Sequence, residues 1–224
     1  MKKLILAFSM FICGNLFAQD CNNYLFLQNN KTVEMTIYDK KAEPSGKQIY
    51  AVSNVATVGG ITSATLNSEM FDKKGKSIAK STTIVKCNGG VMMMDMRMNL
   101  SSQQQQQIGS TTATADNVYI EYPSNMNVGD QLKDGTFQMD ITTNGMNQSI
   151  GMSITERKVE SKETVTTTAG TWECFKISYK SKTVIKTMGI GIPMNMDGTE
   201  WYAPGVGVIK SESKYGGTAI TAIN

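Results

Sequence analysis

Methionine is the residue type whose spacing most suggests chemistry in this chain. Residues 91–98 read Val-Met-Met-Met-Asp-Met-Arg-Met, so alternate methionines would share one face of a β-strand. A thioether can fill an irregular gap in a core, adapt to varied apolar ligands, or bind Cu(I) as a soft ligand. The candidate ligand-lining residues are Met92, Met94, Met96, Met98, Met139 and Met152.

Two observations bear on these uses of methionine. No histidine and no paired cysteines accompany the methionines to complete a Cu(I) site. The methionines are also spread over many segments, which favours packing in a core or around an adaptable apolar concavity. Cu(I) binding through methionine stays open as an alternative, and we predict no other metal and no cofactor.

The chain contains no histidine at all, which removes the commonest general base and metal ligand near neutral pH. A Ser-His-Asp triad, a Cys-His pair and histidine-ligated zinc are therefore excluded. No nucleophile-elbow, P-loop or dinucleotide-binding motif appears either. Asp95, Glu121 and Asp140 leave a carboxylate-only glycosidase as a formal alternative, but isolated acids on strands usually face solvent. We predict a protein without enzymatic activity and without catalytic residues.

Apolar and polar residues alternate along most of the chain, which is typical of half-buried β-strands. The expected strands cover residues 33–37, 49–55, 61–71, 77–87, 137–141, 150–154, 159–165, 172–185, 200–203 and 206–213. The pattern predicts an all-β protein with a strongly curved antiparallel sheet, a half-open or closed β-barrel, connected mostly as an up-and-down meander. A short helix or loop excursion is expected near residues 100–110, where five glutamines follow one another.

Two polar segments resemble each other. Tyr38-Asp-Lys-Lys and Phe71-Asp-Lys-Lys both follow an apolar strand, and both lead into a Gly-Lys step. Asp and Gly supply turn conformations, and Lys keeps the tip of a turn solvated. We therefore predict the same hairpin turn at both places.

Residues 1–18 have the composition of a cleavable signal peptide. Lys2 and Lys3 precede an apolar stretch that ends at Phe17 and is shorter than the ~20 residues needed to span a bilayer. Cleavage after Ala18 would leave residues 19–224 as a single β domain, in the periplasm or outside the cell. We predict no transmembrane segment in the remainder. The mature net charge of about +1 is too balanced for a nucleic-acid-binding protein.

Three of the four cysteines would remain after signal cleavage, in a compartment that favours disulfides. In an up-and-down meander, the start of the first strand and the end of the fourth lie at the same end of the sheet. Cys21 precedes the former and Cys87 ends the latter, so we predict a Cys21–Cys87 disulfide. Cys174 lies within an apolar strand and is predicted to be a buried free thiol.

Two segments near the C-terminus carry a family resemblance. Residues 163–177 read Glu-Thr-Val-Thr-Thr-Thr-Ala-Gly-Thr-Trp-Glu-Cys-Phe-Lys-Ile, and residues 200–212 read Glu-Trp-Tyr-Ala-Pro-Gly-Val-Gly-Val-Ile-Lys-Ser-Glu. With Cys21 and Cys87, they resemble the Gram-negative periplasmic proteins grouped as domain of unknown function 3108. Thr168 departs from the family, which usually has proline there. The resemblance implies a curved sheet similar to the half-barrels of periplasmic lipoprotein carriers, and no established activity.

We therefore expect a non-enzymatic periplasmic binding protein that carries or senses a lipid or another amphiphile in a Met-rich apolar concavity. Its partner would be that hydrophobic ligand. The main alternative is a structural or envelope-assembly protein that binds another envelope protein and whose packed core holds no ligand.

Overall fold

The computed structural model describes residues 21–100, 119–143, 146–187 and 190–224. The predicted signal peptide, residues 1–18, and the predicted excursion beyond Leu100 lie outside the described residues. The strands are β1 (Thr32–Asp39), β2 (Pro44–Val58), β3 (Ile61–Asp72), β4 (Ser77–Asn88), β5 (Val91–Asp95), β6 (Tyr119–Tyr122), β7 (Gly135–Thr143), β8 (Met146–Thr167), β9 (Gly170–Thr187), β10 (Ile190–Ala203), β11 (Gly207–Ser213) and β12 (Gly216–Ile223).

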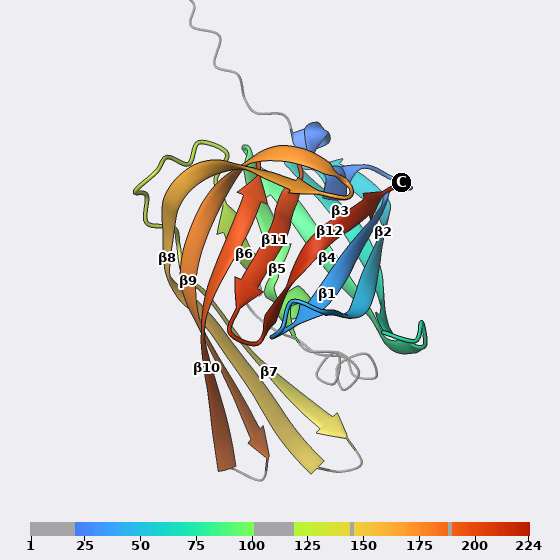
Figure 1. Ribbon diagram of the computed structural model, residues 1–224, viewed down its shortest axis with the longest axis vertical. Helices are drawn as coiled ribbons and strands as arrows, with labels where there is room; N and C mark the ends of the chain where they lie inside the picture. The colour runs from blue at the N-terminus through green and yellow to red at the C-terminus, as the bar shows by residue number, and fades with distance from the viewer. Residues whose placement is uncertain (1–20, 101–118, 144–145, 188–189) are drawn as a thin grey trace, which may run out of the picture.

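The strands form one antiparallel sheet that wraps into a nearly closed barrel, which confirms the predicted fold class (Figure 1). Their spatial order is β6-β5-β4-β3-β2-β1-β12-β11-β10-β9-β8-β7. The first and last strands of the chain, β1 and β12, therefore pair in the middle of the sheet, with Val33 opposite Ile223. The two sheet edges, β6 and β7, approach each other and close the barrel without pairing along their length. The alternation pattern did not predict β6 and β12.

The two Asp-Lys-Lys segments form hairpin turns of the same kind, as predicted. Between β1 and β2, one carboxylate oxygen of Asp39 accepts hydrogen bonds from the backbone N–H groups of Lys41 and Glu43, at 2.8 and 3.0 Å. Between β3 and β4, Asp72 accepts two backbone hydrogen bonds in the same way, at 2.8 and 2.9 Å. Each aspartate holds its turn internally, which leaves the lysines at the solvated tip.

The N-terminal segment lies at one end of the barrel. It forms two 3-10 turns, η1 (Cys21–Asn23) and η2 (Leu25–Leu27), and all three residues of η2 are buried. The Leu25 backbone N–H donates to the Gly205 carbonyl at 2.9 Å, which ties this segment to the turn between β10 and β11. In the part of the chain that the structure describes, no helix has the length and apolar character needed to cross a membrane.

The cysteines are arranged as predicted. Cys21 and Cys87 form a disulfide, with their Cα atoms 5.7 Å apart, and this bond joins the N-terminal segment to the end of β4. Cys174 is a buried free thiol. In the chain-entropy model, a bridge that closes a loop of this length stabilises the fold by about 4 kcal/mol.

The strand predicted through the methionine segment ends early. β5 stops at Asp95, and a 3-10 turn, η3 (Met96–Asn99), follows it. The buried Asp95 carboxylate accepts a hydrogen bond from the Arg97 backbone N–H at 2.9 Å and also binds the Arg97 side chain. Because this cap turns the chain out of the ladder, the expectation that Met96 and Met98 continue one strand face is wrong.

Four strands continue beyond the barrel as an arm (Figure 1). We define the arm as β7 with residues 146–155 of β8, residues 180–187 of β9 and residues 190–197 of β10, the part in which β10 does not pair with β11. β8 and β9 belong to both parts of the molecule, since they contain 22 and 18 residues. The strands predicted separately at 150–154 and 159–165 are therefore one strand, and the strand predicted at 200–203 is the end of β10.

A bulge in β8 marks the passage from the arm to the barrel. The pairing of β8 with β9 gains one residue between Thr155 and Lys158, and Glu156 has a positive φ of 51°. Even-numbered residues such as Ile154 are buried before the bulge, and odd-numbered residues such as Arg157 are buried after it. A bulge re-aims the side chains that follow it, and this one turns Arg157 into the barrel.

Candidate functional site

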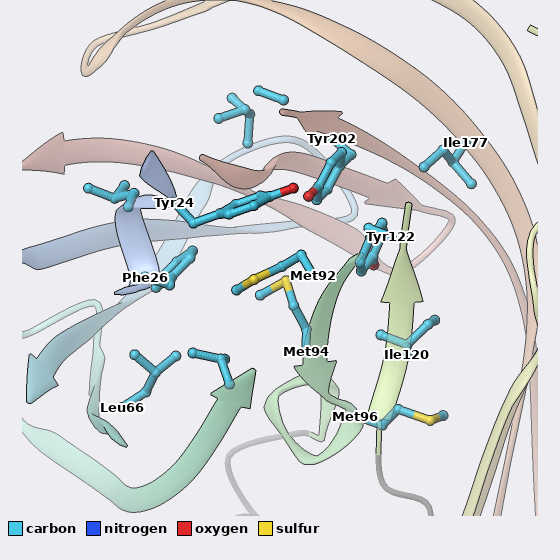
Figure 2. Close-up of a cluster of buried hydrophobic side chains, with 14 of the residues drawn as sticks. Tyr24, Phe26, Leu66, Met92, Met94, Met96, Ile120, Tyr122, Ile177 and Tyr202 are labelled. Atoms are coloured by element: carbon cyan, nitrogen blue, oxygen red, sulfur yellow. The ribbon is translucent and has the colours of Figure 1, made fainter. Parts of the chain in front are cut away.

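The candidate methionines fall into two groups. Met92, Met94 and Met96 lie in the barrel core, and Figure 2 shows them among the aromatic and aliphatic side chains that fill it. A methyl group added to Gly135 would lie 2.8 Å from the Met96 sulfur, so Met96 fills the space against that glycine at the start of β7. Met98 is partly buried against the same core. The first three methionines therefore pack the barrel and do not lie on an open surface.

Met139 and Met152 belong to the arm. Residues directly opposite each other on neighbouring antiparallel strands share one face of the sheet. Two such rows cross the arm from β7 to β10: Met139, Ile150, Ile185 and Ile192, and Phe137, Met152, Thr183 and Met194. We call the side of the arm that carries these two rows, together with Ile190 and Met196 of the same alternation, the arm face.

The arm face is covered on one side and open on the other. Met139 and Ile150, on β7 and β8, are buried. On β10, by contrast, Ile190 is 73%, Ile192 is 70% and Met194 is 54% exposed. Large apolar side chains exposed together mark sites of interaction or ligand binding. The alternation of these three residues is visible in the sequence, but their exposure is not, and our sequence-based prediction omitted them.

In the described residues, β10 has a free edge along the arm. Its pairing with β11 involves Gly198–Ala203, whereas residues 190–197 pair with β9 alone. A free edge can recruit another strand, and proteins block such edges with charge, bulges or proline. Pro193 has no N–H group and interrupts the donors of this segment. The arm is therefore better suited to bind a ligand on its face than to accept a strand at its edge.

Polar residues replace the apolar rows where the arm face meets the barrel. Tyr179 of β9 pairs with Gly198 of β10, and its ring lies directly on that glycine. A methyl group added to Gly198 would lie 2.3 Å from the ring. Burial raises the pKa of the Tyr179 hydroxyl far above its usual 10.0, so the hydroxyl stays protonated. Glu200 follows on the same face, two residues along β10.

A buried ion pair lies in the barrel beyond this junction. Arg157 is fully buried, and its Nη1 donates to the backbone carbonyls of Glu121 and Lys133, at 2.9 Å each. Its Nη2 lies 3.6 Å from Glu200 Oε1, and the Tyr122 hydroxyl donates to Glu200 Oε2 at 3.1 Å. Glu121 belongs to β6 and Lys133 precedes β7, so Arg157 joins the two edges of the sheet.

Aromatic rings enclose this ion pair. The Tyr122 ring stacks on the Tyr202 ring at 4.5 Å, and the Arg157 guanidinium lies 4.7 Å from the centre of the Tyr122 ring. Burial raises the pKa of the Glu200 carboxyl, while the Arg157 charge opposes that rise. Burial also raises the pKa of Tyr122, with the Glu200 charge as the second cause. The enclosed position suits a structural role in closing the barrel.

Sequence reasoning missed Arg157 and Glu200, because arginine and glutamate are rarely buried. The only signal in the sequence was the alternation on either side of Arg157, and the bulge changes its phase. Glu200 could not be assigned to the barrel interior before the pairing of β10 was known.

The segments that carry the family resemblance meet in space. The Trp201 indole N–H donates to Glu163 Oε1 at 2.5 Å, and the Lys210 ammonium lies 4.7 Å from the centre of the Trp201 ring. The indole hydrogen bond lowers the pKa of Glu163. Thr168, at the departure from the family pattern, donates its hydroxyl hydrogen bond to the Thr221 carbonyl at 2.8 Å. These residues hold the β8–β9 hairpin against the barrel.

The free thiol and the three carboxylates considered for catalysis lie in different environments and do not form one site. Burial raises the pKa of the Cys174 thiol to about 11, so the thiol stays protonated. Asp95 caps η3, Glu121 forms a 2.7 Å ion pair with Lys133, and Asp140 is exposed on the arm. Within the described ranges, no three Cys, Asp or Glu side chains gather in a group that could hold a metal ion.

The protein is thus a nearly closed antiparallel barrel with a projecting arm that carries an apolar face. The chain belongs to the DUF3108-like family, whose profile matches residues 28–218. None of the curated proteins compared with it shows significant similarity.

Two crystal structures share the fold. One is a Bacteroides fragilis protein with a YmcC-like fold that is inferred to be exported, with 22% identity and a TM-score of 0.70 over 88% of this chain and 96% of that one. The other, from Parabacteroides distasonis, is inferred to be a lipoprotein, with 21% identity and a TM-score of 0.73 over 92% of this chain and 100% of that one. At this level of identity the likeness concerns the fold.

Proposed function

We propose that this protein is a non-enzymatic, exported binding protein that holds the hydrocarbon part of a lipid or another amphiphile on the arm face. The observation that carries the proposal is the joint exposure of Ile190, Ile192 and Met194 on a sheet face that continues into the buried rows of the arm. Burying one such side chain contributes about 1.5–3 kcal/mol. A hydrocarbon chain on the arm face would recover part of this free energy at each of the three residues.

Three observations support export. Residues 1–18 have signal-peptide character, and the Cys21–Cys87 disulfide is of the kind that persists in oxidising compartments. The two related structures are inferred to be an exported protein and a lipoprotein. In the periplasm, lipids and envelope proteins are the apolar partners that such a surface would meet.

The proposed surface differs from a concavity lined by all six methionines. All five of these methionines are buried in one apolar cluster, Met92, Met94, Met96, Met139 and Met152. Met139 and Met152 differ in that their rows continue across the sheet to the exposed residues of β10. The methionine thioethers in the core contact apolar neighbours, so we do not extend the proposal to Cu(I).

Native mass spectrometry tests the proposal. Delipidated protein is titrated with dodecyl maltoside below its micellar concentration, and the bound fraction is compared with that of Ile192→Lys and Val58→Lys. Ile192→Lys places a charge on the arm face, and we expect the affinity to fall about tenfold or more. Val58 is 78% exposed on the barrel and serves as the matched control, with affinity unchanged.

Equal loss in both variants would place the ligand elsewhere on the protein. If the wild-type protein binds neither dodecyl maltoside nor a lysophospholipid, the surface instead serves a protein partner, as the envelope-assembly alternative holds.

A further inference from the structure

The hairpin turns that follow odd-numbered strands lie at one end of the molecule, because consecutive strands are antiparallel neighbours in a single sheet. This end carries the β1–β2, β3–β4 and β11–β12 turns of the barrel, and the arm projects from it (Figure 1). We call it the arm end. The β2–β3, β4–β5, β8–β9 and β10–β11 turns lie at the opposite end, together with the N-terminal segment.

The three barrel turns of the arm end are rich in lysine. They expose six lysine side chains to solvent: Lys40, Lys41, Lys73, Lys74, Lys76 and Lys214. Within the described residues, none of the six takes part in an ion pair within 4.0 Å, whereas other lysines, such as Lys133 and Lys158, do. The six ammonium groups are therefore available to an anionic partner.

Carboxylates at the arm end do not balance these lysines. Asp39 and Asp72 flank two of the turns, and each accepts backbone hydrogen bonds within its own turn. Glu43 is the one acidic residue inside the three turns. Four turns of the opposite end contain no charged residue, namely 59–60, 89–90, 168–169 and 204–206. The chain as a whole is close to neutral, yet its arm end is cationic.

Exposed apolar side chains accompany the lysines at the arm end. Ile190 and Ile192 lie on the part of β10 farthest from the barrel, and they are 73% and 70% exposed. Tyr215, in the β11–β12 turn, is 57% exposed, and the Lys214 ammonium lies 5.1 Å from the centre of its ring. A tyrosine, with an apolar ring and a polar hydroxyl, suits the interface between a membrane and water.

Lysines and apolar side chains on one surface suit a membrane that contains anionic lipids. The apolar groups enter the region between head groups and acyl chains, and the ammonium groups are attracted by the negative surface potential. The six lysines lie on three separate turns, and lysine is a point charge on a flexible stem. They therefore match phosphates that move laterally in a bilayer better than a fixed pattern of carboxylates on an acidic protein.

We propose that the arm end binds the surface of a bilayer that contains anionic phospholipids. The six lysines contact the lipid phosphates, and Ile190, Ile192 and Tyr215 enter the interface. The inference goes beyond the proposed function, because attachment to the surface does not require a lipid to leave the bilayer. It also places the arm face beside the lipids that the proposed function would have it bind.

Co-sedimentation with vesicles tests the inference. The purified protein is titrated with vesicles of phosphatidylcholine and with vesicles of an equimolar mixture of phosphatidylcholine and phosphatidylglycerol. We expect the protein to bind the mixed vesicles about tenfold more tightly. High salt should reduce this preference, since exposed lysines are screened.

Neutralising one lysine turn locates the contact. The double variant Lys73→Gln, Lys74→Gln should bind the mixed vesicles about tenfold more weakly. Asp72 accepts from the backbone N–H groups of Lys74 and Lys76, which the substitutions leave in place, so the turn is preserved. The matched control is Lys31→Gln, Lys162→Gln, which removes the same charge near the opposite end of the barrel and should leave binding unchanged.

A second pair of variants tests the apolar contact. Ile192→Ser should weaken binding to the mixed vesicles about fivefold, because it removes apolar surface that enters the interface. Val58→Ser is the control, since Val58 is 78% exposed beside an uncharged turn of the opposite end. We expect this variant to bind like the wild-type protein.

Equal binding to the two kinds of vesicle, or an equal loss in the two double variants, would overturn the inference. If the protein binds dodecyl maltoside but no vesicles, the inference fails and the proposed function stands. If it binds the mixed vesicles but not dodecyl maltoside, the inference stands and the proposed function fails.

Discussion

The barrel and the arm are built from the same alternating strands, yet residues of the same type are buried in the barrel and exposed on part of the arm. Met92 in the barrel has no exposed surface, whereas Met194 in the arm is 54% exposed. In the barrel each inward side chain meets the opposite wall of the curved sheet. On the β10 side of the arm, the described residues provide no such wall. A strand pattern therefore specifies a face to be buried, and the tertiary fold decides whether anything covers it.

The barrel also contains buried charged groups, which the arm face lacks. Arg157 and Glu200 are buried together, and Arg157 bridges the two sheet edges through backbone carbonyls. A buried ion pair contributes little net stability compared with an apolar pair, but removing one partner is costly. Substitutions in the two regions should therefore differ in their effect on stability.

Arg157→Met should destabilise the protein most. It removes the hydrogen bonds to Glu121 and Lys133 and leaves the Glu200 carboxylate buried without its partner, and we expect a loss of about 4 kcal/mol. Urea unfolding followed by circular dichroism measures this loss. Adding Glu200→Gln to Arg157→Met should restore part of the stability. A loss below about 1 kcal/mol in the single variant would show that Arg157 does not close the barrel.

Replacing one methionine in each region tests the difference in burial directly. Met92→Ala should cost about 3 kcal/mol because it leaves a cavity in the core. Met194→Ala should change the free energy of unfolding by less than about 0.5 kcal/mol, because its side chain is largely solvated. The same urea titration serves both variants. Equal losses would mean that the arm face is covered in solution.

The junction of the two regions is sensitive to side-chain volume. Gly198→Ala should displace the Tyr179 ring, which leaves no space for a methyl group, at a cost of about 2 kcal/mol. Gly191→Ala in the arm is the matched control, since its nearest neighbours are side-chain atoms at 3.3 Å that can move. Thermal unfolding of the two variants gives the comparison. A junction variant as stable as the control would show that the ring moves freely.

The smallest expected effect is a pH dependence of the free energy of unfolding that arises from Glu200 in the barrel. Burial raises the pKa of Glu200 above its usual 4.5, so the folded protein binds this proton more tightly than the unfolded chain. The contribution of Glu200 is therefore fully present below pH 4.5 and is lost as the pH rises through the folded-state pKa. Glu200→Gln should remove this decline. Parallel stability curves for wild type and variant between pH 4 and 8 would contradict the buried position of Glu200.

The sequence predicted much of the barrel but little of the candidate site. Alternation located β1 to β4, and the Asp39 and Asp72 turns are local, because each aspartate binds its own hairpin. The Cys21–Cys87 bond followed from the meander order. By contrast, η3 ends the methionine strand because of one aspartate cap, and the bulge at Glu156 shifts the phase of β8. The cap leaves no mark in hydrophobic periodicity, and the change of phase at the bulge does not reveal that the segments on either side form one strand.

Alternation and turn residues act over short distances, so the elements and their inward faces can be read from the chain. Which of those faces is covered depends on how the strands assemble into the sheet. The free segment of β10 arises because its pairing with β11 starts at Gly198, and the partners of Arg157 come from β6, the segment before β7 and β10. Burial depends on what packs opposite a strand, and that is a property of the whole sheet.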